Sequence, residues 1–450
     1  MVVERSNDER ELLAKAQRYS FRARMDKKTA EGPVFASAKD SVVTDVNGKN
    51  YLDFNSGQMC AALGHNHPTV VAAIKEACDT MIHAHSSHYN VKEIELAYRI
   101  GQIMPAPLEK SVFGESGSDA NELAMTIARK ATGGYEIASP HLSFHGLSEA
   151  TRSVTYAGWH AGHGPLMPGT HAIVAPYCYR CPLAQTFPAC EFACLRTSFE
   201  LLDAQATGQP AAVITEPLFS AGGVVEPPPG WLKVLAEICR ARGMLLIVDE
   251  EQTGLGKLGA MFGFERDGVV PDIVTIAKHF GGGVGISAVT TSAAIEEKVI
   301  RSGFVATHSH SNDPLICAAG IASIDVIEKD DVPAKAHAIG VAMRERLEAL
   351  QQRYELIGDV RGRGQLTGVE LVRDRQTKEP ASEAGRLIHK MCFEGGLIFS
   401  LRRNGSVLRF VPPATTRLDQ IDRAMEILQD ALEVASVNRR RTPVSTPKAL

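Results

Sequence analysis

Residues 244–285 read MLLIVDEEQTGLGKLGAMFGFERDGVVPDIVTIAKHFGGGVG and contain two short apolar runs, each followed by a charged side chain. Asp249 follows the first run, Met244–Val248, and Lys278 follows the second, Ile273–Ala277. Continuous apolar runs of this length are typical of strands buried on both faces of a parallel sheet. Because ligands bind at the carboxyl ends of such strands, we predict an α/β fold in which Asp249 and Lys278 share one rim of the sheet.

A carboxylate and a lysine at one rim can hold a pyridine ring. The carboxylate pairs with the ring nitrogen, and the lysine forms a Schiff base with an aldehyde on the ring. Each residue alone has a simpler interpretation, because an Asp after a strand often caps a helix and a Lys there is often a solvated loop residue. The pair, with the triglycine Gly281–Gly283 behind the lysine, favours a cofactor site.

The same stretch resembles the signature of the class III, fold-type I aminotransferases, which use pyridoxal phosphate (PLP). Four elements carry the resemblance: Asp249, Gln252-Thr253-Gly254, Pro271-Asp272 and Lys278. It extends from about residue 35 to residue 432. It implies a large domain with a mainly parallel seven-stranded sheet flanked by helices and a smaller α+β domain. It also implies a homodimer with shared active sites, or a tetramer.

Composition narrows the choice of protein class. A chain of 450 residues can bury the core of one large and one small domain. With 22% charged residues and a net charge of −4, it shows no sign of binding nucleic acid or an anionic membrane. The N-terminus MVVERSNDERELL carries charges where a signal peptide needs an apolar core, so we expect a cytoplasmic protein. Nine cysteines, an odd number, argue against a disulfide framework.

The expected organisation has four parts. An N-terminal arm, helical over Glu9–Met25, precedes a hairpin at Asn47-Gly48, a dipeptide that strongly indicates a tight turn between strands. A polar, Pro-containing segment ends the chain, and we expect it to be disordered. The parts are residues 1–60 (arm and hairpin, joined to the small domain), 61–330 (large PLP-binding domain), 331–436 (small α+β domain) and 437–450 (disordered tail).

A run of small residues before a predicted helix is a candidate anion site. Such a helix N-terminus presents bare amides and the positive end of the helix dipole. The run 114–122 has this character, although a capping box alone explains the same pattern. In the family a Ser/Thr-Gly-Ser/Ala triplet stands here, which implies that Ser116, Gly117 and Ser118 bind the PLP phosphate. Asp119 replaces the usual Glu.

The resemblance implies further contacts to the cofactor. Phe144 would lie on the ring face and His145 beside it, although Phe144 alone reads as a core aromatic. Glu216 ends another predicted strand at the same rim. Gln252 would hydrogen-bond the phenolic oxygen, and Ser309 would reach the PLP phosphate of the neighbouring subunit.

Two residues are candidates for binding substrate. In the family an arginine matching Arg409 clamps the substrate carboxylate, a task that suits the planar guanidinium, although an Arg in a strand can also be a surface residue. The segments 52–59 and 358–364 resemble the 2,2-dialkylglycine decarboxylases most closely. There the glutamine matching Gln58 acts with the lysine to favour loss of CO2, so Gln58 joins Lys278 and Asp249 as a catalytic candidate.

Departures from the decarboxylase pattern leave the substrate open. Phe144 stands where that enzyme has Trp, and Leu147 and Ala221 replace a Met and a Ser. Glu251 occupies a position that is usually small and apolar, against the ring. Its carboxylate could repel a substrate carboxylate, pair with a substrate amine, or turn outward.

Two metal sites are also candidates. The resemblance implies an alkali cation at Ser86, Ser309 and Asp313, whose oxygen ligands suit a hard ion. The spacing C-x2-C followed by C-x3-C is compatible with tetrahedral zinc, and reduced cysteines packed in a loop are the alternative. The cysteines concerned are Cys178, Cys181, Cys190 and Cys194.

The function expected from these residues is transfer of an amino group from an amino acid or amine to a 2-oxo acid such as pyruvate, with Lys278 moving the proton. The first half-reaction would remove either CO2 or a proton. The alternatives are an ordinary aminotransferase acting on amino acids or omega-amines and, more remotely, a PLP-fold binding protein without catalysis.

Overall fold

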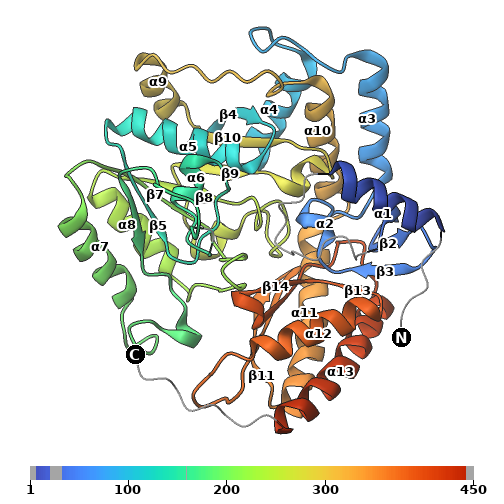
Figure 1. Ribbon diagram of the computed structural model, residues 1–450. Coiled ribbons are helices and arrows are strands. Elements are labelled where there is room, and N and C mark those ends of the chain that lie inside the picture. The colour runs from blue at the N-terminus through green and yellow to red at the C-terminus, as the bar shows by residue number, and fades with distance from the viewer. Residues whose placement is uncertain (1–6, 21–32, 159, 442–450) are drawn as a thin grey trace.

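The computed structural model describes residues 7–20, 33–158 and 160–441, and a seven-stranded sheet lies at its centre (Figure 1). In spatial order its strands are β4 (Leu108–Gly114), β10 (Ser287–Ser292), β9 (Ile273–Ile276), β8 (Leu245–Asp249), β7 (Pro210–Thr215), β5 (Glu136–Pro140) and β6 (Thr170–Ile173). β10 runs antiparallel to both of its neighbours, and the remaining pairs are parallel. The expected mainly parallel seven-stranded sheet is confirmed.

The two strands that end in the charged residues are direct neighbours. β8 and β9 pair in parallel, with Val248 opposite Val274 and Asp249 opposite Thr275. Every residue of β9 is buried, as the unbroken apolar run predicted. Lys278 opens the 3-10 helix η3 (Lys278–Gly281) two residues after β9 ends. The predicted rim therefore exists, with Asp249 and Lys278 on adjacent strand ends.

Helices cover both faces of this sheet. Side chains along a strand alternate between the two faces, so the apolar strands present a hydrophobic surface to a helical layer on each side. Ile247 and Ile273 pack with one helical layer, whereas Val248 and Val274 pack with the other. The first layer holds α5 (Gly117–Thr132), α6 (Glu149–Ser153) and α9 (Ala293–Arg301). The second layer holds α4 (Val91–Ile103), α7 (Ala193–Gln205), α8 (Trp231–Ala241) and α10 (Pro314–Lys329).

The C-terminal part forms a smaller α+β unit with its own core. Its antiparallel sheet has the order β11 (Ile357–Arg363), β12 (Leu366–Leu371), β15 (Val407–Phe410) and β14 (Ser400–Arg402). Its helices are α11 (Val332–Arg353), α12 (Ser382–Glu394) and α13 (Leu418–Arg441). Phe54, from the other end of the chain, is fully buried in this core.

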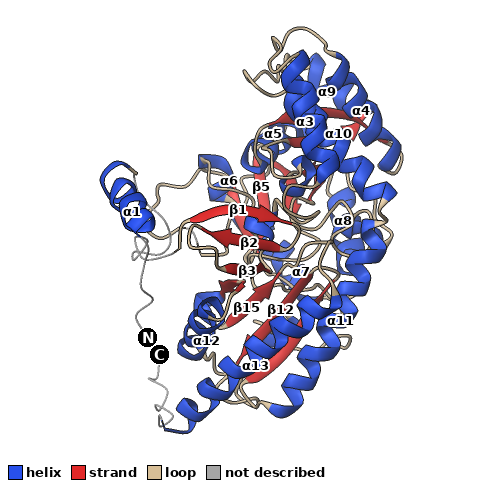
Figure 2. Cartoon of the chain, turned by 90° about the vertical axis from the view of Figure 1, so that its right-hand side faces the viewer, coloured by secondary structure: helices blue, strands red, loops and turns tan. Residues whose placement is uncertain are grey.

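A third sheet joins the two ends of the chain. Figure 2 shows its strands β1 (Phe35–Lys39), β2 (Val42–Asp45) and β3 (Asn50–Asp53) between the large sheet and the C-terminal strands. The hairpin predicted at Asn47-Gly48 connects β2 and β3 and is confirmed. β13 (Leu397–Ile398) then pairs in parallel with β3, and the Leu52 amide donates to the Gly396 carbonyl at 2.8 Å.

The expectations for the two termini need correction. The N-terminal helix α1 is Asn7–Tyr19, and residues 21–25 of the longer helix that we expected lie outside the described residues. Residues 437–441, expected to begin a disordered tail, continue α13, whereas residues 442–450 lie outside the description. The division at residues 60 and 330 stays a prediction.

The remaining elements are α2 (Ser56–Met59), α3 (Pro68–Thr80), η1 (Cys178–Arg180), η2 (Gly263–Asp267) and η4 (Arg403–Gly405). None of the helices described here is both long and apolar enough to cross a membrane.

Candidate active site

Lys278 is held at the rim by a carboxylate from the neighbouring strand end. Its Nζ lies 3.1 Å from Oε2 of Glu251, and both side chains are largely buried. Burial lowers the pKa of Lys278, but the negative charges of Glu251 and Asp249 outweigh it and raise this pKa above its ordinary value. Burial and the charge of Asp249 raise the pKa of Glu251 to about 7. The sequence left the orientation of Glu251 open, and the structure turns it inward.

Asp249 is fixed by two partners, one from α5 and one from the loop between β5 and α6. Nδ1 of His145 lies 2.8 Å from Oδ2 of Asp249, and the amide nitrogen of Asn121 lies 2.8 Å from the same oxygen. The Asn121 carbonyl accepts a hydrogen bond from Thr275 at 2.8 Å, which sets the orientation of its amide. The same amide nitrogen is 2.9 Å from Oε1 of Glu251. Both carboxylates therefore have defined positions.

The predicted anion site lies at the start of α5. Ser116 is the N-cap: its hydroxyl accepts from the Asp119 amide at 3.3 Å, and Asp119 accepts from the Ser116 amide at 3.0 Å. The capping box is therefore present, and Asp119 serves where the family has Glu. A capping box satisfies only some of the amides of the first turn. A Cβ on Gly117 would lie 1.8 Å from Oε2 of Glu251, so only glycine fits between this turn and the carboxylate.

Glu216 ties together two loops at the rim. Its carboxylate accepts from the Phe144 amide at 3.0 Å and from the Ser220 amide at 3.3 Å. Burial and the charge of Asp249 raise the pKa of Glu216 well above its ordinary value. Phe144 is half-buried, and its stacking on a cofactor ring stays a prediction.

Arg409 lies on β15 of the small unit and reaches the same region. It is 1% exposed, and it donates to the hydroxyls of Ser400 and Ser220, both at 3.0 Å, and to Oε1 of Gln252 at 3.3 Å. Within the described residues its Nη2 has no hydrogen-bond partner. Burial and the charge of Arg402 lower the pKa of Arg409 well below its ordinary value. A buried guanidinium without a carboxylate partner is the arrangement expected of a site that binds one from a ligand.

Gln58 is the least constrained of the candidates. It lies in α2 with non-helical backbone angles and is exposed, and its side-chain oxygen accepts from Asn55 at 3.3 Å. A role for Gln58 beside Lys278 stays a prediction.

Three residues at this rim were not chosen from the sequence. Lys257 is fully buried, and in the described part of the chain its Nζ has no hydrogen-bond partner. Burial and the positive charge of Lys278 lower the pKa of Lys257 to about 7. Burial raises the pKa of Glu250 to about 7. Asn121 is the third. The sequence signal that could have identified it is the pair Asn121-Glu122, which follows the triplet 116–118 that is expected to bind phosphate.

An alkali cation at Ser86, Ser309 and Asp313 stays a prediction. In the described part of the chain the side chains that hydrogen-bond the Asp313 carboxylate are His83 and His310, and neither Ser86 nor Ser309 is among them. Ser309 is exposed in the loop before α10, so its contact to a neighbouring subunit stays a prediction.

The four cysteines of the zinc prediction line one small cavity of about 20 Å³ beside η1. All four are free thiols. Within the described residues, no three of their sulfur atoms lie within 4.8 Å of one another, whereas zinc with thiolate ligands at about 2.3 Å needs closer sulfurs. A zinc ion in this loop therefore stays a prediction, and reduced cysteines packed in a loop describe the structure as it stands. They are Cys178, Cys181, Cys190 and Cys194.

The residues present fit a PLP molecule at each of its ends. The start of α5 suits a phosphate, and Asp249 suits a ring nitrogen. Lys278 suits an aldehyde, and the free Nη2 of Arg409 suits a substrate carboxylate. Glu251 is the one departure, because its carboxylate lies against Gly117 where the cradle begins. The fold and this site together define an α/β enzyme that works with a pyridine cofactor.

The chain belongs to the class-III aminotransferase family, whose description matches residues 26–432. It is 38% identical over 403 residues to an uncharacterized aminotransferase of Schizosaccharomyces pombe, covering 89% of this chain and 90% of that protein. It is 35% identical to a leucine/methionine racemase of Thermococcus litoralis, covering 92% of this chain and 94% of that protein.

A solved structure shows the same fold. The amine transaminase from an uncultivated Pseudomonas species, in its PLP-bound form, aligns with a TM-score of 0.87 at 29% identity and covers 93% of this chain and 98% of that chain. The fold is that of the PLP-dependent transaminases of fold type I, and the chain is a class III PLP-dependent aminotransferase. The resemblance to 2,2-dialkylglycine decarboxylases stays a prediction.

The ion pair between Glu251 and Lys278 predicts a change in cofactor uptake. Condensation with an aldehyde needs a neutral amine, and the charged Glu251, present above about pH 7, holds Lys278 protonated. In Glu251→Gln the amide can still face Asn121, but Asp249 is then the one nearby carboxylate left to oppose burial, so the pKa of Lys278 falls. We expect the pH profile for PLP uptake by the apoprotein to shift to lower pH by at least about one unit. The rate at which the visible absorbance of the bound cofactor grows, recorded at several pH values between 6 and 9, gives this profile.

Glu250→Gln is the matched control for that experiment, because Glu250 is equally buried but accepts from Thr253 and Phe264 and does not contact Lys278. Its profile should match that of the unmodified chain. If Glu251→Gln and Glu250→Gln give the same profile, the ion pair does not control the amine.

Proposed function

We propose that this enzyme transfers an amino group from an amino acid or amine to a 2-oxo acid such as pyruvate, removing a proton and not CO2 from the donor. One observation carries the proposal: the buried guanidinium of Arg409, whose Nη2 has no partner among the described residues, reaches the rim that also holds Lys278. The amine transaminase structure with PLP bound supports the same chemistry.

Each residue has a proposed task. Bound PLP supplies an electron sink for negative charge at the substrate Cα. The Lys278 amine would take the proton from the donor Cα and deliver it to the cofactor carbon that carried the aldehyde, and Glu251 sets how readily that amine accepts a proton. Asp249, oriented by His145 and Asn121, keeps a proton on the ring nitrogen.

Substrate orientation is assigned to the small unit. Arg409 would hold the donor carboxylate through the hydrogens of Nη2, because Nε already donates to Ser400 and Nη1 to Ser220 and Gln252, which fixes the guanidinium plane. Gln252 accepts from Arg409 through its oxygen, which leaves its amide hydrogens for the phenolic oxygen of the ring. The proposal includes a homodimer in which the exposed Ser309 reaches the neighbouring site.

Decarboxylation is the second candidate, and Gln58 is the residue that favours it. One assay separates the two functions. The purified enzyme is given pyruvate with either L-alanine analogues or 2-aminoisobutyrate, a donor that has no Cα proton. We expect amino transfer from donors with a Cα proton, and neither CO2 nor acetone from 2-aminoisobutyrate. Release of both would establish the decarboxylating alternative.

Two further arms of the assay test the family assignment against other activities. Because one relative is a leucine/methionine racemase, L-leucine is incubated without any 2-oxo acid, and the appearance of D-leucine would show racemisation in place of transfer. A protein that turns yellow with PLP but acts on no donor would be a binding protein, and the proposal would then fail.

A further inference from the structure

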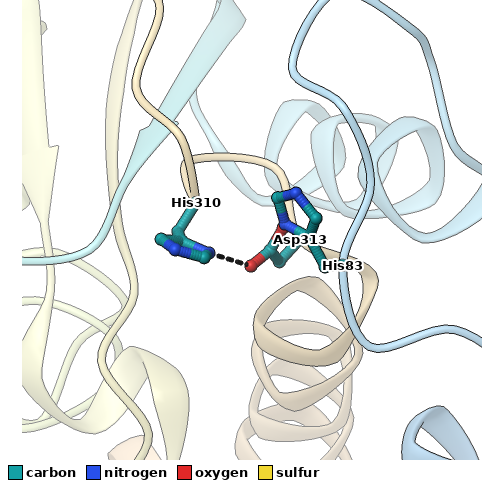
Figure 3. Close-up of side chains that lie close together, drawn as sticks. All are labelled: His83, His310 and Asp313. Atoms are coloured by element: carbon teal, nitrogen blue, oxygen red, sulfur yellow. Dashed lines mark hydrogen bonds and ion pairs between the residues drawn. The ribbon is translucent and has the colours of Figure 1, made fainter.

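Two histidines and an aspartate meet at the start of α10, and none of them is assigned to catalysis. Figure 3 shows His310 and His83 converging on Asp313 from separate segments. Nδ1 of His83 lies 2.6 Å from Oδ1 of Asp313, and Nδ1 of His310 lies 2.7 Å from Oδ2. Of the described residues, only this trio offers three metal-ligating atoms that all lie within 4.8 Å of one another.

The carboxylate of this cluster is fixed before any ion binds. Asp313 is 7% exposed and precedes Pro314, the first residue of α10. Its Oδ1 also accepts from the Ala84 amide at 3.3 Å, which ties it to the segment that carries His83. The same two segments are joined again where the Asn90 side chain donates to the Asn312 carbonyl at 2.7 Å. The anionic ligand is therefore buried and held by backbone.

The two imidazoles, in contrast, are exposed in the single chain. The side chains of His83 and His310 are 52% and 63% exposed, and their rings lie 5.1 Å apart between centroids. Each ring can release its hydrogen bond from Nδ1 to Asp313, carry its proton on the exposed Nε2, and turn a lone pair on Nδ1 toward a cation. No proton has to leave a neutral histidine for this exchange.

We propose that His83, His310 and Asp313 bind one borderline divalent cation, Zn²⁺ being the best match, with water completing its coordination. Two imidazoles and one carboxylate suit zinc, cobalt or nickel, whereas alkali ions prefer oxygen ligands alone. The site thus differs from the alkali site expected at Ser86, Ser309 and Asp313 in both its ligands and its ion. It does not depend on the proposed function.

A bound ion would join two segments that are 230 residues apart in sequence. One lies between α3 and α4, and the other precedes α10. Because a cation bound only to the folded chain stabilises it by mass action, binding should also raise the unfolding temperature.

Metal titration of the full chain tests the proposal. Protein freed of metal with a chelator is titrated with ZnCl2 in a calorimeter, and with CoCl2 while the visible absorbance of four-coordinate cobalt is followed. We expect one ion per chain. Loss of a direct ligand in His83→Ala or His310→Ala should weaken binding at least about tenfold, since even residues behind a ligand contribute 10- to 100-fold.

The control is His308→Ala, because His308 is an exposed histidine of the same loop that does not belong to the trio. It should bind Zn²⁺ as tightly as the unmodified chain. Equal weakening in all three variants would mean adsorption to a histidine-rich surface, and no weakening in any would place the ion elsewhere. Loss in Cys181→Ser would place it in the four-cysteine loop. Each of these results overturns the proposal. Circular dichroism in chelator checks that the variants fold.

Discussion

Lys278→Ala is expected to lower turnover at least about a thousandfold, the upper part of the range for removing a positioned acid–base group. Lys278 is the cation that Glu251 contacts at the end of β9, and its backbone is in the left-handed region with φ of 57°. That conformation is unusual for a lysine and is kept by the surrounding buried loop. The variant should bind PLP without covalent attachment. Steady-state kinetics and mass spectrometry after borohydride reduction measure the two effects.

The same experiment distinguishes Lys278 from Lys257 as the residue that binds the cofactor covalently. It is buried at the same rim, and its pKa of about 7 leaves half of its amine neutral near neutral pH. On its pKa alone it would be the better nucleophile. Its place is wrong, however, because it follows the turn after Gln252 and not a strand end. Lys257→Met should therefore keep the covalent label on Lys278. A label on Lys257, or turnover in Lys278→Ala, would refute the assignment.

Arg409→Gln should lower kcat/KM for amino acid donors on the order of a hundredfold, about 2.7 kcal/mol, within the range for leaving a buried charge without its partner. The guanidinium has hydroxyl partners, and in the described part of the chain no carboxylate forms an ion pair with it, so its negative partner would come from the substrate. The effect should fall mainly on KM, because the contact exists in both ground and transition states. Single-turnover kinetics with the donor alone measure it without interference from the 2-oxo acid.

An amine donor without a carboxylate, such as 1-phenylethylamine, is the control for this variant. Its half-reaction should keep nearly the rate of the unmodified enzyme in Arg409→Gln. If the rates with the amine and with the amino acid fall equally, Arg409 supports the structure of the site and does not recognise the carboxylate. If neither suffers, another cation binds the substrate.

Local patterns were enough to predict the rim of the large sheet. The apolar runs before Asp249 and Lys278 predicted two buried parallel strands, and β8 and β9 are adjacent and in register. The Asn47-Gly48 turn predicted its hairpin for a similar reason, since its backbone geometry is set by the two residues themselves. Such features depend on neighbours in sequence, which a single chain displays directly.

Features that depend on distant residues could not be obtained in this way. Asn121 contacts Asp249 and Glu251, which lie 128 and 130 residues away in the sequence. No spacing of residues in a single sequence predicts contacts over such separations. The contacts of Asp313 with His83 and His310 were likewise not predicted, because His83 lies 230 residues away in the sequence. The inward position of Glu251 likewise depends on Asn121 and Lys278 together.

The parallel pairing of β3 with β13 has a consequence for biosynthesis. Leu52 and its partner Leu397 are 345 residues apart, so a ribosome completes most of the chain before β3 acquires its second neighbour. Until then β3 is a strand with an open edge, able to pair with other nascent chains. Large chains expose such edges while they await later segments. At the junction of the two ends, a newly made chain thus keeps one strand edge unpaired until synthesis is nearly finished.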